Sequence, residues 1–543
     1  MATAIAAKPE VFTRKASGLV RVMSPYSAFV YNILTMGLIF PWTYLWAPGA
    51  LPGGRLVWGI LLAMLLEIPI AFSYVWLSTA LPRSGGDYVF QSRVFGGGVG
   101  FTVVMSGFVI WILQWVALSG WLLAYLGFAP LFLGLGATLG NATLSAIGLW
   151  FTGSTGIVIT SILNALVSML ILISGFKNYV RFQNVMWIGT LIAFFTMLVV
   201  LFTATPSMSP SRLDTFAVAV GGAPNWYQTA IQATQAAGID FNAPFSLLAT
   251  LLVAPIAWTS LQWATYSAEQ NGEIKDARSF KNQAIILVGS LVATGILLAL
   301  LAAALEHAVG TEFLYVAGAG YWSKVSEATI NGFWLWPNMI AVALTASPIV
   351  VILIALGYIL NSHQIVHNCY IGVTRCMVAM SLDRLLPEWV SRVNARFHTP
   401  VNAHLVYFLA SIPVILLYNL YGNWVTLTLG VTFACGYVFV ISSLAGALLP
   451  YRAKEVYEAS PGASYKLGSI PWVTILGGIG FVGGGIMVLL FMFYSQLGLT
   501  STLAYVVVFG VLAVSALWYV LAKRAQKGRG INVEYAFKEI PPE

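Results

Sequence analysis

Charged side chains are scarce in this chain of 543 residues, which has 26 Lys and Arg and 18 Asp and Glu. They make up 8% of the chain, against about 25% in an ordinary globular protein. Hydrophobic residues account for 59%. A surface facing water could not be covered with so few polar groups, so the composition excludes a soluble globular protein and indicates a membrane protein.

Other absences exclude further classes. The three cysteines, Cys369, Cys376 and Cys435, lie in or beside apolar segments without metal-ligand spacing, which predicts packing residues. No glycine loop followed by Lys and Ser or Thr is present, so ATP should not bind and drive the protein directly. Basic residues are dispersed between apolar stretches, which argues against a nucleic-acid partner. We therefore expect no cofactor, no metal, no nucleic acid and no enzymatic activity, and an uncleaved N-terminal segment without a signal peptide.

Long uncharged stretches are what the chain does have. The segments 94–176, 397–451 and 467–522 contain no Asp, Glu, Lys or Arg. One spanning helix needs about 20 apolar residues, so each segment crosses the bilayer more than once. Each is also flanked by Lys or Arg at both ends, which favours two crossings. The apolar runs predict twelve spans, at 24–47, 56–80, 99–127, 154–176, 186–204, 246–268, 284–305, 338–374, 402–420, 426–450, 473–495 and 502–522.

The basic residues also predict an orientation in the cell membrane. With both termini in the cytoplasm, 23 of the 26 Lys and Arg lie inside. We interpret 129–153 as an external loop with a short helix at the membrane interface, because a third crossing there would put Lys177 and Arg181 outside. The segment 206–245 is a second long external connection, for which we expect structure of its own or a gating role.

Four connections carry motifs. They read LPRSGGDYVFQSRVFG (81–96), GEIKDARSFKNQAI (272–285), TRCMVAMSLDRLLPEWVSRVNARFHTPVNAHL (374–405) and LLPYRAKEVYEASPGASYKLGSIPW (448–472). In this order they resemble the amino acid-polyamine-organocation (APC) superfamily of transporters. The resemblance implies an all-α membrane protein of twelve helices with the leucine-transporter-type fold, two inverted repeats of five helices followed by two more. The expected division is 1–23 tail, 24–204 first repeat, 205–245 external loop, 246–450 second repeat, 451–522 last two spans and 523–543 tail.

The resemblance also implies that the first and sixth spans unwind around a small-molecule substrate. Pro41 and Pro255 agree with this, since a proline frees a helical carbonyl, which lipid tolerates only beside protein or a wet cavity. Free N–H and C=O groups can hold a zwitterion without charged side chains. By family position the substrate residues are Thr35, Met36, Gly37, Leu38, Ala257, Trp258, Thr259, Ser260 and Gln262. Trp258 stands where the family has an aromatic that closes over the substrate; the alternative is an aromatic packed between helices.

The chain departs from the family at these breaks. The first keeps one glycine, Gly37, and the second has Ser260 and Gln262 where glycine and an acidic residue are common. Missing glycines restrict the approach of a carboxylate to the backbone, so an amine, a polyamine or a bulkier amino acid derivative remains open beside an ordinary α-amino acid.

Two polar features lie inside predicted spans. Glu67 is an acidic residue in the middle of the second span, where it binds a proton or supports a broken helix, and in both cases faces protein. In the eighth span, His363 and His367 share one face, as do Asn361, Gln364 and Asn368. These residues predict a proton-coupling element or a polar pathway lining. A metal pair is the weakest interpretation, because no carboxylate or thiolate completes the set.

The coupling ion stays open at this point. The family's sodium site uses small hydroxyl side chains of the eighth span, where this chain has Asn, His and Gln. The fifth span has no Lys between 186 and 204 that could replace sodium. Proton coupling or uncoupled exchange is left beside a weakened sodium hypothesis. The expected function is a secondary transporter of amino acids or related amines working by alternating access, and the alternative is a nutrient sensor or channel on the same fold.

Overall fold

The computed structural model describes residues 17–39, 42–421, 424–497 and 502–539, without the side chains of 424–434. Pro41, which we expected in the first break, lies outside these residues. The helices of the first half are α1 (Pro25–Met36), α2 (Thr43–Ala50), α3 (Leu56–Ala80), α4 (Gly86–Phe95), α5 (Gly97–Val104), α6 (Ile112–Leu122), α7 (Ala129–Leu139), α8 (Ala142–Thr152), α9 (Ser154–Ile173), α10 (Phe176–Thr203), α11 (Ser209–Ala219) and α12 (Trp226–Ala236).

The second half is also helical, with a single hairpin among the described residues. It contains α13 (Leu247–Leu261), the 3-10 helix η3 (Gln262–Glu273), α14 (Phe280–Ala284), α15 (Ser290–Trp322), α16 (Pro337–Leu344), α17 (Pro348–Leu382), α18 (Val401–Leu420), α19 (Trp424–Arg452), α20 (Lys454–Glu458), β1 (Lys466–Leu467), β2 (Ile470–Pro471), α21 (Trp472–Phe493) and α22 (Thr502–Gly528).

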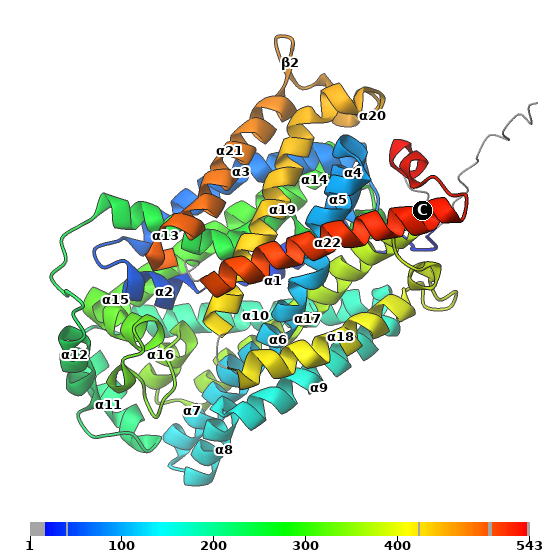
Figure 1. Ribbon diagram of the computed structural model, residues 1–543. Coiled ribbons are helices and arrows are strands. Elements are labelled where there is room, and N and C mark those ends of the chain that lie inside the picture. Colours follow the sequence, from blue (N-terminus) through cyan, green and yellow to red (C-terminus); the bar gives the residue numbers. More distant parts are fainter. Residues whose placement is uncertain (1–16, 40–41, 422–423, 498–501, 540–543) are drawn as a thin grey trace, which may run out of the picture.

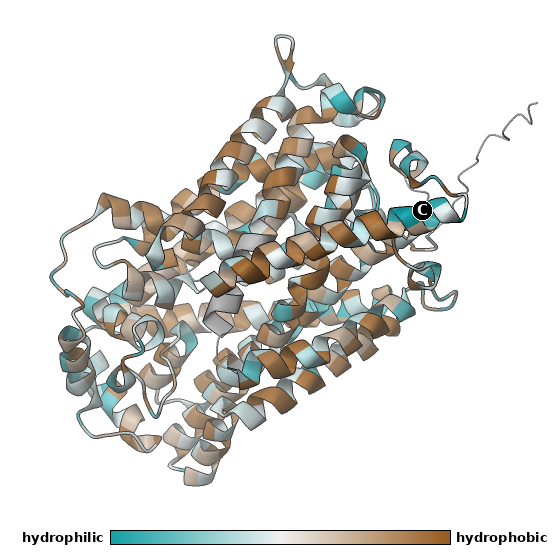
Figure 2. Ribbon diagram, viewed as in Figure 1, coloured by the Kyte–Doolittle hydropathy of each residue, from teal (hydrophilic) through white to brown (hydrophobic). Residues whose placement is uncertain are grey.

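Within the described residues, 11 helical segments are long and apolar enough to cross a membrane. The remaining predicted span, the first, is divided into α1 with 12 residues and α2 with 8 residues, each too short to cross alone. The prediction of an all-α membrane protein is confirmed. Figure 2 shows the reason, since hydrophobic residues follow the long helices and hydrophilic ones concentrate at their ends.

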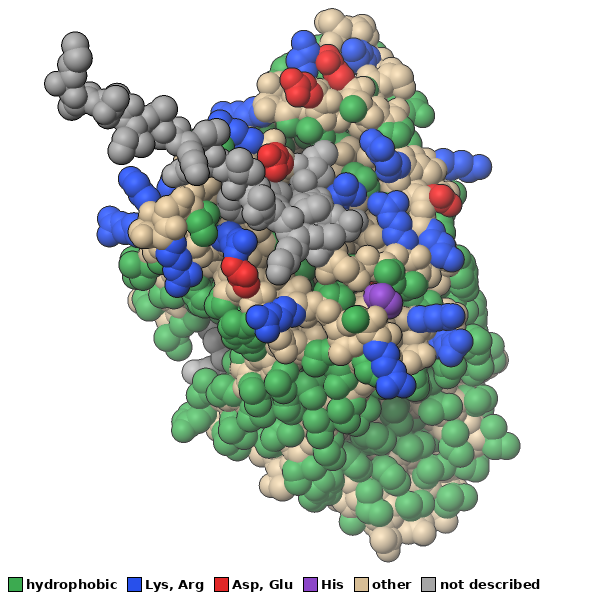
Figure 3. All heavy atoms as spheres, turned by 90° about the vertical axis from the view of Figure 1, so that its right-hand side faces the viewer, with side chains coloured by type: hydrophobic (Ala, Val, Ile, Leu, Met, Phe, Trp, Pro, Cys, Tyr) green, Lys and Arg blue, Asp and Glu red, His purple; other side chains and the backbone are tan. Residues whose placement is uncertain are grey.

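The two ends of the helical bundle differ in charge. In Figure 1, α4, α14, α20, β2 and the C-terminus lie toward the upper right, and α7, α8, α11 and α12 lie toward the lower left. Figure 3 views the molecule from the right-hand side and shows Lys and Arg gathered over the upper part of this face, with hydrophobic side chains below. We call the end that carries α4, α14, α20 and β2 the basic end, and the other end the α11 end.

The segment 129–153 contains more helix than predicted, since one short helix was expected and both α7 and α8 lie in it. One helical run of 43 residues continues from Gly97 to Leu139, and α8 folds back beside its end. Hydroxyl groups inside the run donate to carbonyls of the same helix and so do not end it. Thr138 Oγ1, for example, donates to the Gly134 carbonyl at 2.8 Å. The run ends only at Gly140, whose φ of 62° is left-handed. In contrast, the expected structure within 206–245 is confirmed as α11 and α12.

Side-chain caps fix where the helices beside the site begin. Ser24 caps α1, accepting from the Ser27 N–H at 3.1 Å, and Pro25 follows at the first helical position. Ser246 caps α13 in the same way through the Ala249 N–H at 3.1 Å. These caps set the register of the two helices that frame the candidate site.

Candidate substrate site

The first span breaks at Gly37. Its φ of 78° is left-handed, and α1 ends one residue earlier, at Met36. Freed carbonyls on either side of the break accept bonds from α17: Tyr358 OH donates to Ile39, and Asn361 Nδ2 donates to Leu34 at 3.4 Å. The predicted break is therefore present, and side chains of the eighth span satisfy its backbone.

The second break lies later than predicted. Ala257, Trp258, Thr259 and Ser260 are α-helical, and the change of geometry comes at Gln262, where η3 begins. Pro255 deletes its own N–H bond only, so α13 passes through it and does not end there.

Side chains stabilise the change to η3. Trp263 Nε1 donates to the Thr259 carbonyl at 3.1 Å, and Gln262 Nε2 reaches the same oxygen at 3.4 Å. One backbone acceptor thus takes side-chain donors where the helix tightens, as expected at a helix end.

A small cavity of about 20 Å³ lies between the two breaks. It is lined by Thr35, Met36, Gly37, Trp42, Trp115, Leu122, Thr259, Ser260, Trp263 and Ile365. Five of these residues were predicted from the sequence. A cavity of this size has room for about one water molecule, so the substrate path is closed at this point.

The cavity is framed by aromatic rings and has no charged residue in its lining. Trp115 and Trp263 meet edge to face, with ring centroids 5.6 Å apart. The indole N–H of Trp115 is buried and has no hydrogen-bond partner among the described residues. Faces of indole rings attract an ammonium group, and a free N–H can donate to a carboxylate. The sequence analysis missed Trp42, Trp115 and Trp263; the aromatic pair Trp258 and Trp263, at either end of the TSLQ run, was the available signal.

The predicted residues outside the lining have other contacts. Leu38, Ala257 and Gln262 are buried. Trp258 points to α3, where its Nε1 donates to Glu67 Oε2 at 2.5 Å, and Glu67 is 0% exposed. The prediction that Glu67 faces protein is confirmed, whereas Trp258 does not line the cavity; the indoles that line it are Trp42, Trp115 and Trp263.

The polar residues of the eighth span separate onto two contact surfaces of α17. Gln364 Nε2 donates to Tyr179 OH and to Asn368 Oδ1, both at 2.7 Å, and Asn368 Nδ2 donates to Thr35 Oγ1 at 2.7 Å. This chain of amides joins α10 and α17 to the first break.

The histidines face elsewhere. His363 Nδ1 lies 2.6 Å from Asn164 Oδ1 on α9, and His367 Nδ1 lies 3.0 Å from the His363 carbonyl. Among the residues the structure describes, no group of three His, Cys, Asp or Glu could hold a metal. The two histidines thus contact α9 and their own helix, and His367 also lies beside Tyr179 of α10, with ring centroids 5.6 Å apart; neither lines the cavity.

Acidic residues at the basic end were missed. Asp87, Glu269, Glu273 and Asp383 are each 0% exposed. The predicted sixth span ended at residue 268, but the helical segment extends to Glu273, so Glu67 is not the only buried acid of the spans. Their side chains are bound by partners from other elements that no local pattern reveals.

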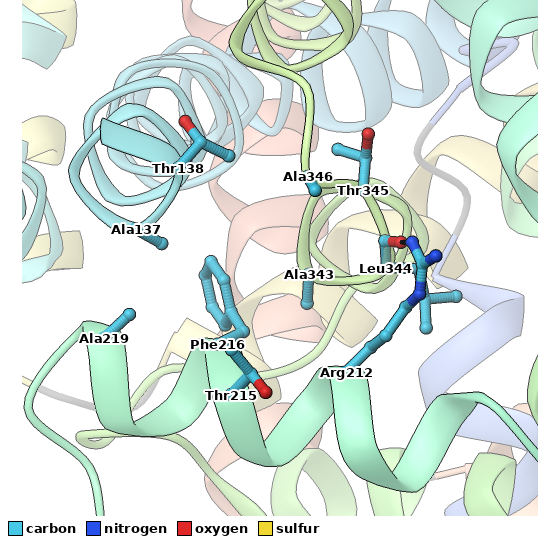
Figure 4. Close-up of a pocket in the computed structure, with 10 residues that line it drawn as sticks. All are labelled: Ala137, Thr138, Arg212, Thr215, Phe216, Ala219, Ala343, Leu344, Thr345 and Ala346. Atoms are coloured by element: carbon cyan, nitrogen blue, oxygen red, sulfur yellow. Dashed lines mark hydrogen bonds between the residues drawn. The ribbon is translucent and has the colours of Figure 1, made fainter. Parts of the chain in front are cut away.

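A larger pocket of about 230 Å³ lies at the α11 end. Figure 4 shows Ala137 and Thr138 of α7 across from Phe216 of α11, with Arg212 beside Leu344. Arg212 donates to the Leu344 carbonyl at the end of α16. The positive charge of Arg212 thus caps the C-terminal end of α16. The cavity between the breaks remains the better candidate for the substrate site.

Two comparisons with known proteins found matches. The protein called "Uncharacterized protein 399" of Sulfolobus islandicus rod-shaped virus 1 is 30% identical over 102 residues, which cover 17% of this chain and 26% of the viral protein. The chain thus matches about a quarter of that relative's length. The family model described as "Amino acid permease" matches residues 25–514, from the first residue of α1 into α22. The chain therefore belongs to the amino acid permease family.

Proposed function

We propose that the protein is a secondary active transporter that carries an amino acid or a related amine across the cell membrane by alternating access. The observation that carries this proposal is the cavity between the break at Gly37 and the start of η3. A permease needs a central site that opens to either side in turn, and paired helix breaks supply both freed backbone groups and hinges. The family also points to a transporter and not an enzyme.

The chemistry of the lining supports a zwitterion or an amine with an apolar side chain. Indole faces favour an ammonium group and apolar surface together, and no fixed charge in the lining competes with the substrate's own. The closed volume of about 20 Å³ means that α1, η3 or both must move before a substrate enters. Binding should therefore be coupled to a conformational change.

The basic end should face the cytoplasm, with the α11 end outside. On the face that Figure 3 shows, Lys and Arg gather at the basic end, which is the charge asymmetry of cytoplasmic loops. Transport is coupled to a proton, with sodium as the alternative ion, or it is an uncoupled exchange of substrates. The inverted repeats 24–204 and 246–450 and the external segment 205–245 belong to this proposal.

Uptake by liposomes containing the purified protein tests the function. A panel of radiolabelled amino acids and amines is offered with and without a pH gradient, and a melting curve with each compound reports binding separately. At least one compound should accumulate and raise the melting temperature. A compound that binds but never moves would instead favour the sensor; the absence of both binding and movement across the panel overturns the transporter.

A further inference from the structure

Two carboxyl groups meet at the basic end, away from the cavity. Asp87 lies at the start of α4 and Glu269 in η3, and both are 0% exposed. The backbone N–H of Asp87 donates to Glu269 Oε1 at 3.0 Å. We call Asp87 and Glu269 the carboxyl pair.

Two glycines allow this close approach. Gly85 N–H donates to the Glu269 carbonyl at 2.7 Å. A Cβ on Gly86 would lie 2.6 Å from the Ala268 carbonyl oxygen, which is too close for any side chain. The paired glycines of the SGGDY motif thus press the N-terminus of α4 against η3, where its N–H groups favour a negative charge.

The other partners of the carboxyl pair are neutral donors. Tyr74 OH and Ser442 Oγ donate to Asp87 Oδ1, and Cys376 Sγ donates to Glu269 Oε2 at 2.8 Å. Asp87 Oδ2 has no further partner among the described residues. The donors come from α3, α19 and α17, so the carboxyl pair joins five elements.

The nearby cations are bound to other carboxylates. Arg375 on α17 donates to both oxygens of Glu273, at 2.6 and 2.8 Å. Arg93 on α4 donates to both oxygens of Asp383, at 2.7 and 3.1 Å. Three further titratable side chains lie in the same region as the carboxyl pair: Tyr88, Tyr266 and His404. His404 lies beside Arg375. No salt bridge reaches the carboxyl pair within the part of the chain that the structure describes.

Two ionised carboxylates cannot share such a place. Like charges this close together, away from water and without a cation, favour the form in which one group keeps its proton, as in carboxylate dyads. Burial raises the pKa of Asp87 above its ordinary value, in the same direction.

We propose that Asp87 and Glu269 form a binding site for one proton, which is held while the basic end is closed and released when it opens. Glu269 belongs to the second half of the broken sixth span, whereas Asp87 and Cys376 belong to α4 and α17. Movement of η3 away from α4 separates the carboxyl groups and admits water. Both groups then ionise, and the proton leaves on that side.

This inference rests on the proposed transport function for its role, but the proton itself can be observed without transport. Because the closed state binds one more proton than the open state, lower pH stabilises the closed basic end. As the pH increases, the ratio of open to closed protein should rise by at most about tenfold for each pH unit.

Infrared spectroscopy of the purified protein in lipid nanodiscs observes the proton directly. The carbonyl band of a protonated carboxylic acid should be present in the wild type and disappear as pH rises. Glu269→Gln and Asp87→Asn should each remove this titrating band, and either amide can still hydrogen-bond to the remaining carboxylate, which preserves the fold. Glu67→Gln identifies any band of the mid-membrane carboxyl, and the exposed Glu455→Gln is the matched control. If neither Glu269→Gln nor Asp87→Asn removes a titrating band that the wild type shares with Glu67→Gln, the proposal is overturned.

Hydrogen exchange of η3, corrected for the intrinsic effect of pH, measures opening. Protection in the wild type should fall with rising pH, whereas Glu269→Gln should remove this slope and Glu455→Gln should keep it. An unchanged slope in Glu269→Gln contradicts the inference. If substrate moves and the carboxyl pair does not titrate, only the inference fails; if the pair titrates and no substrate moves, the transport function fails.

Discussion

At the scale of single residues, the hydrogen bond from Trp258 to Glu67 is the contact that was hardest to predict from the sequence. The sequence pointed to both residues, but for separate roles. The distance of 2.5 Å between Trp258 Nε1 and Glu67 Oε2 shows that they form one unit. Glu67 Oε1 has no partner, so the indole is the donor on which this buried carboxyl depends.

Replacing Trp258 by Phe should therefore destabilise the protein. A buried acceptor left without its donor costs about 1–3 kcal/mol, so the melting temperature in detergent should fall. Glu67→Gln should cost less, because the amide oxygen still accepts from the indole. The double variant should lose less than the sum of the single variants, and Trp150→Phe, on an exposed ring, should have little effect. Strictly additive losses contradict a bond between the two residues.

Trp115 offers a residue-level test of the substrate site. Trp115→Phe keeps the ring beside the cavity and removes the buried N–H that lacks a partner. If that N–H binds the substrate, the loss of about 1.4 kcal/mol raises KM by about tenfold. Trp111→Phe is the matched control, because its buried N–H also lacks a partner and it does not line the cavity. Equal uptake kinetics for Trp115→Phe and the wild type would remove this donor from the site.

At the scale of elements, the contact between α4 and η3 depends on the absence of a side chain. Gly86→Ala places a Cβ 2.6 Å from a backbone oxygen, and backbone cannot move aside as a side chain can. We expect a loss of about 1–3 kcal/mol, seen as a lower melting temperature, and faster hydrogen exchange in η3. Gly478→Ala in α21 meets nothing within 4 Å and should be neutral. Equal stability of the two variants would mean that the approach of α4 to η3 is not tight.

The elements also show what the sequence can and cannot predict. Apolar runs predicted the spans well, because lipid demands them whatever the packing. They did not predict the full extent of helix in 129–153, where it continues through small and polar residues. They also ended the sixth span too early, because a buried acidic residue cannot be told from a loop residue in the sequence. Pro255 indicated a break near the right place, but the geometry changes where the side chain of Trp263 binds a backbone carbonyl. Such contacts depend on the tertiary structure and have no signal in the local sequence.

At the scale of the whole molecule, two distributions of charge serve different purposes. On the face that Figure 3 shows, the exposed Lys and Arg gather at the basic end, as the proposed orientation requires. Buried charges at that end form one-to-one pairs, Arg375 with Glu273 and Arg93 with Asp383, and leave the carboxyl pair without a cation. The centre of the bundle, around the cavity, has no charge in its lining. In the proposed mechanism, substrate recognition and the response to protons are thus separated along the transport path.

The orientation can be tested on the whole protein, because its three native cysteines are buried and should not react with a reagent in water. Ser207 precedes α11 and Ser464 follows α20, so a single new cysteine at either exposed position reports one end of the bundle. In intact cells, a membrane-impermeant maleimide should label Ser207→Cys and not Ser464→Cys. After the membrane is permeabilised, both variants should react, while the wild type stays unlabelled throughout. Labelling of Ser464→Cys alone in intact cells would reverse the orientation, and with it the side on which the carboxyl pair releases its proton.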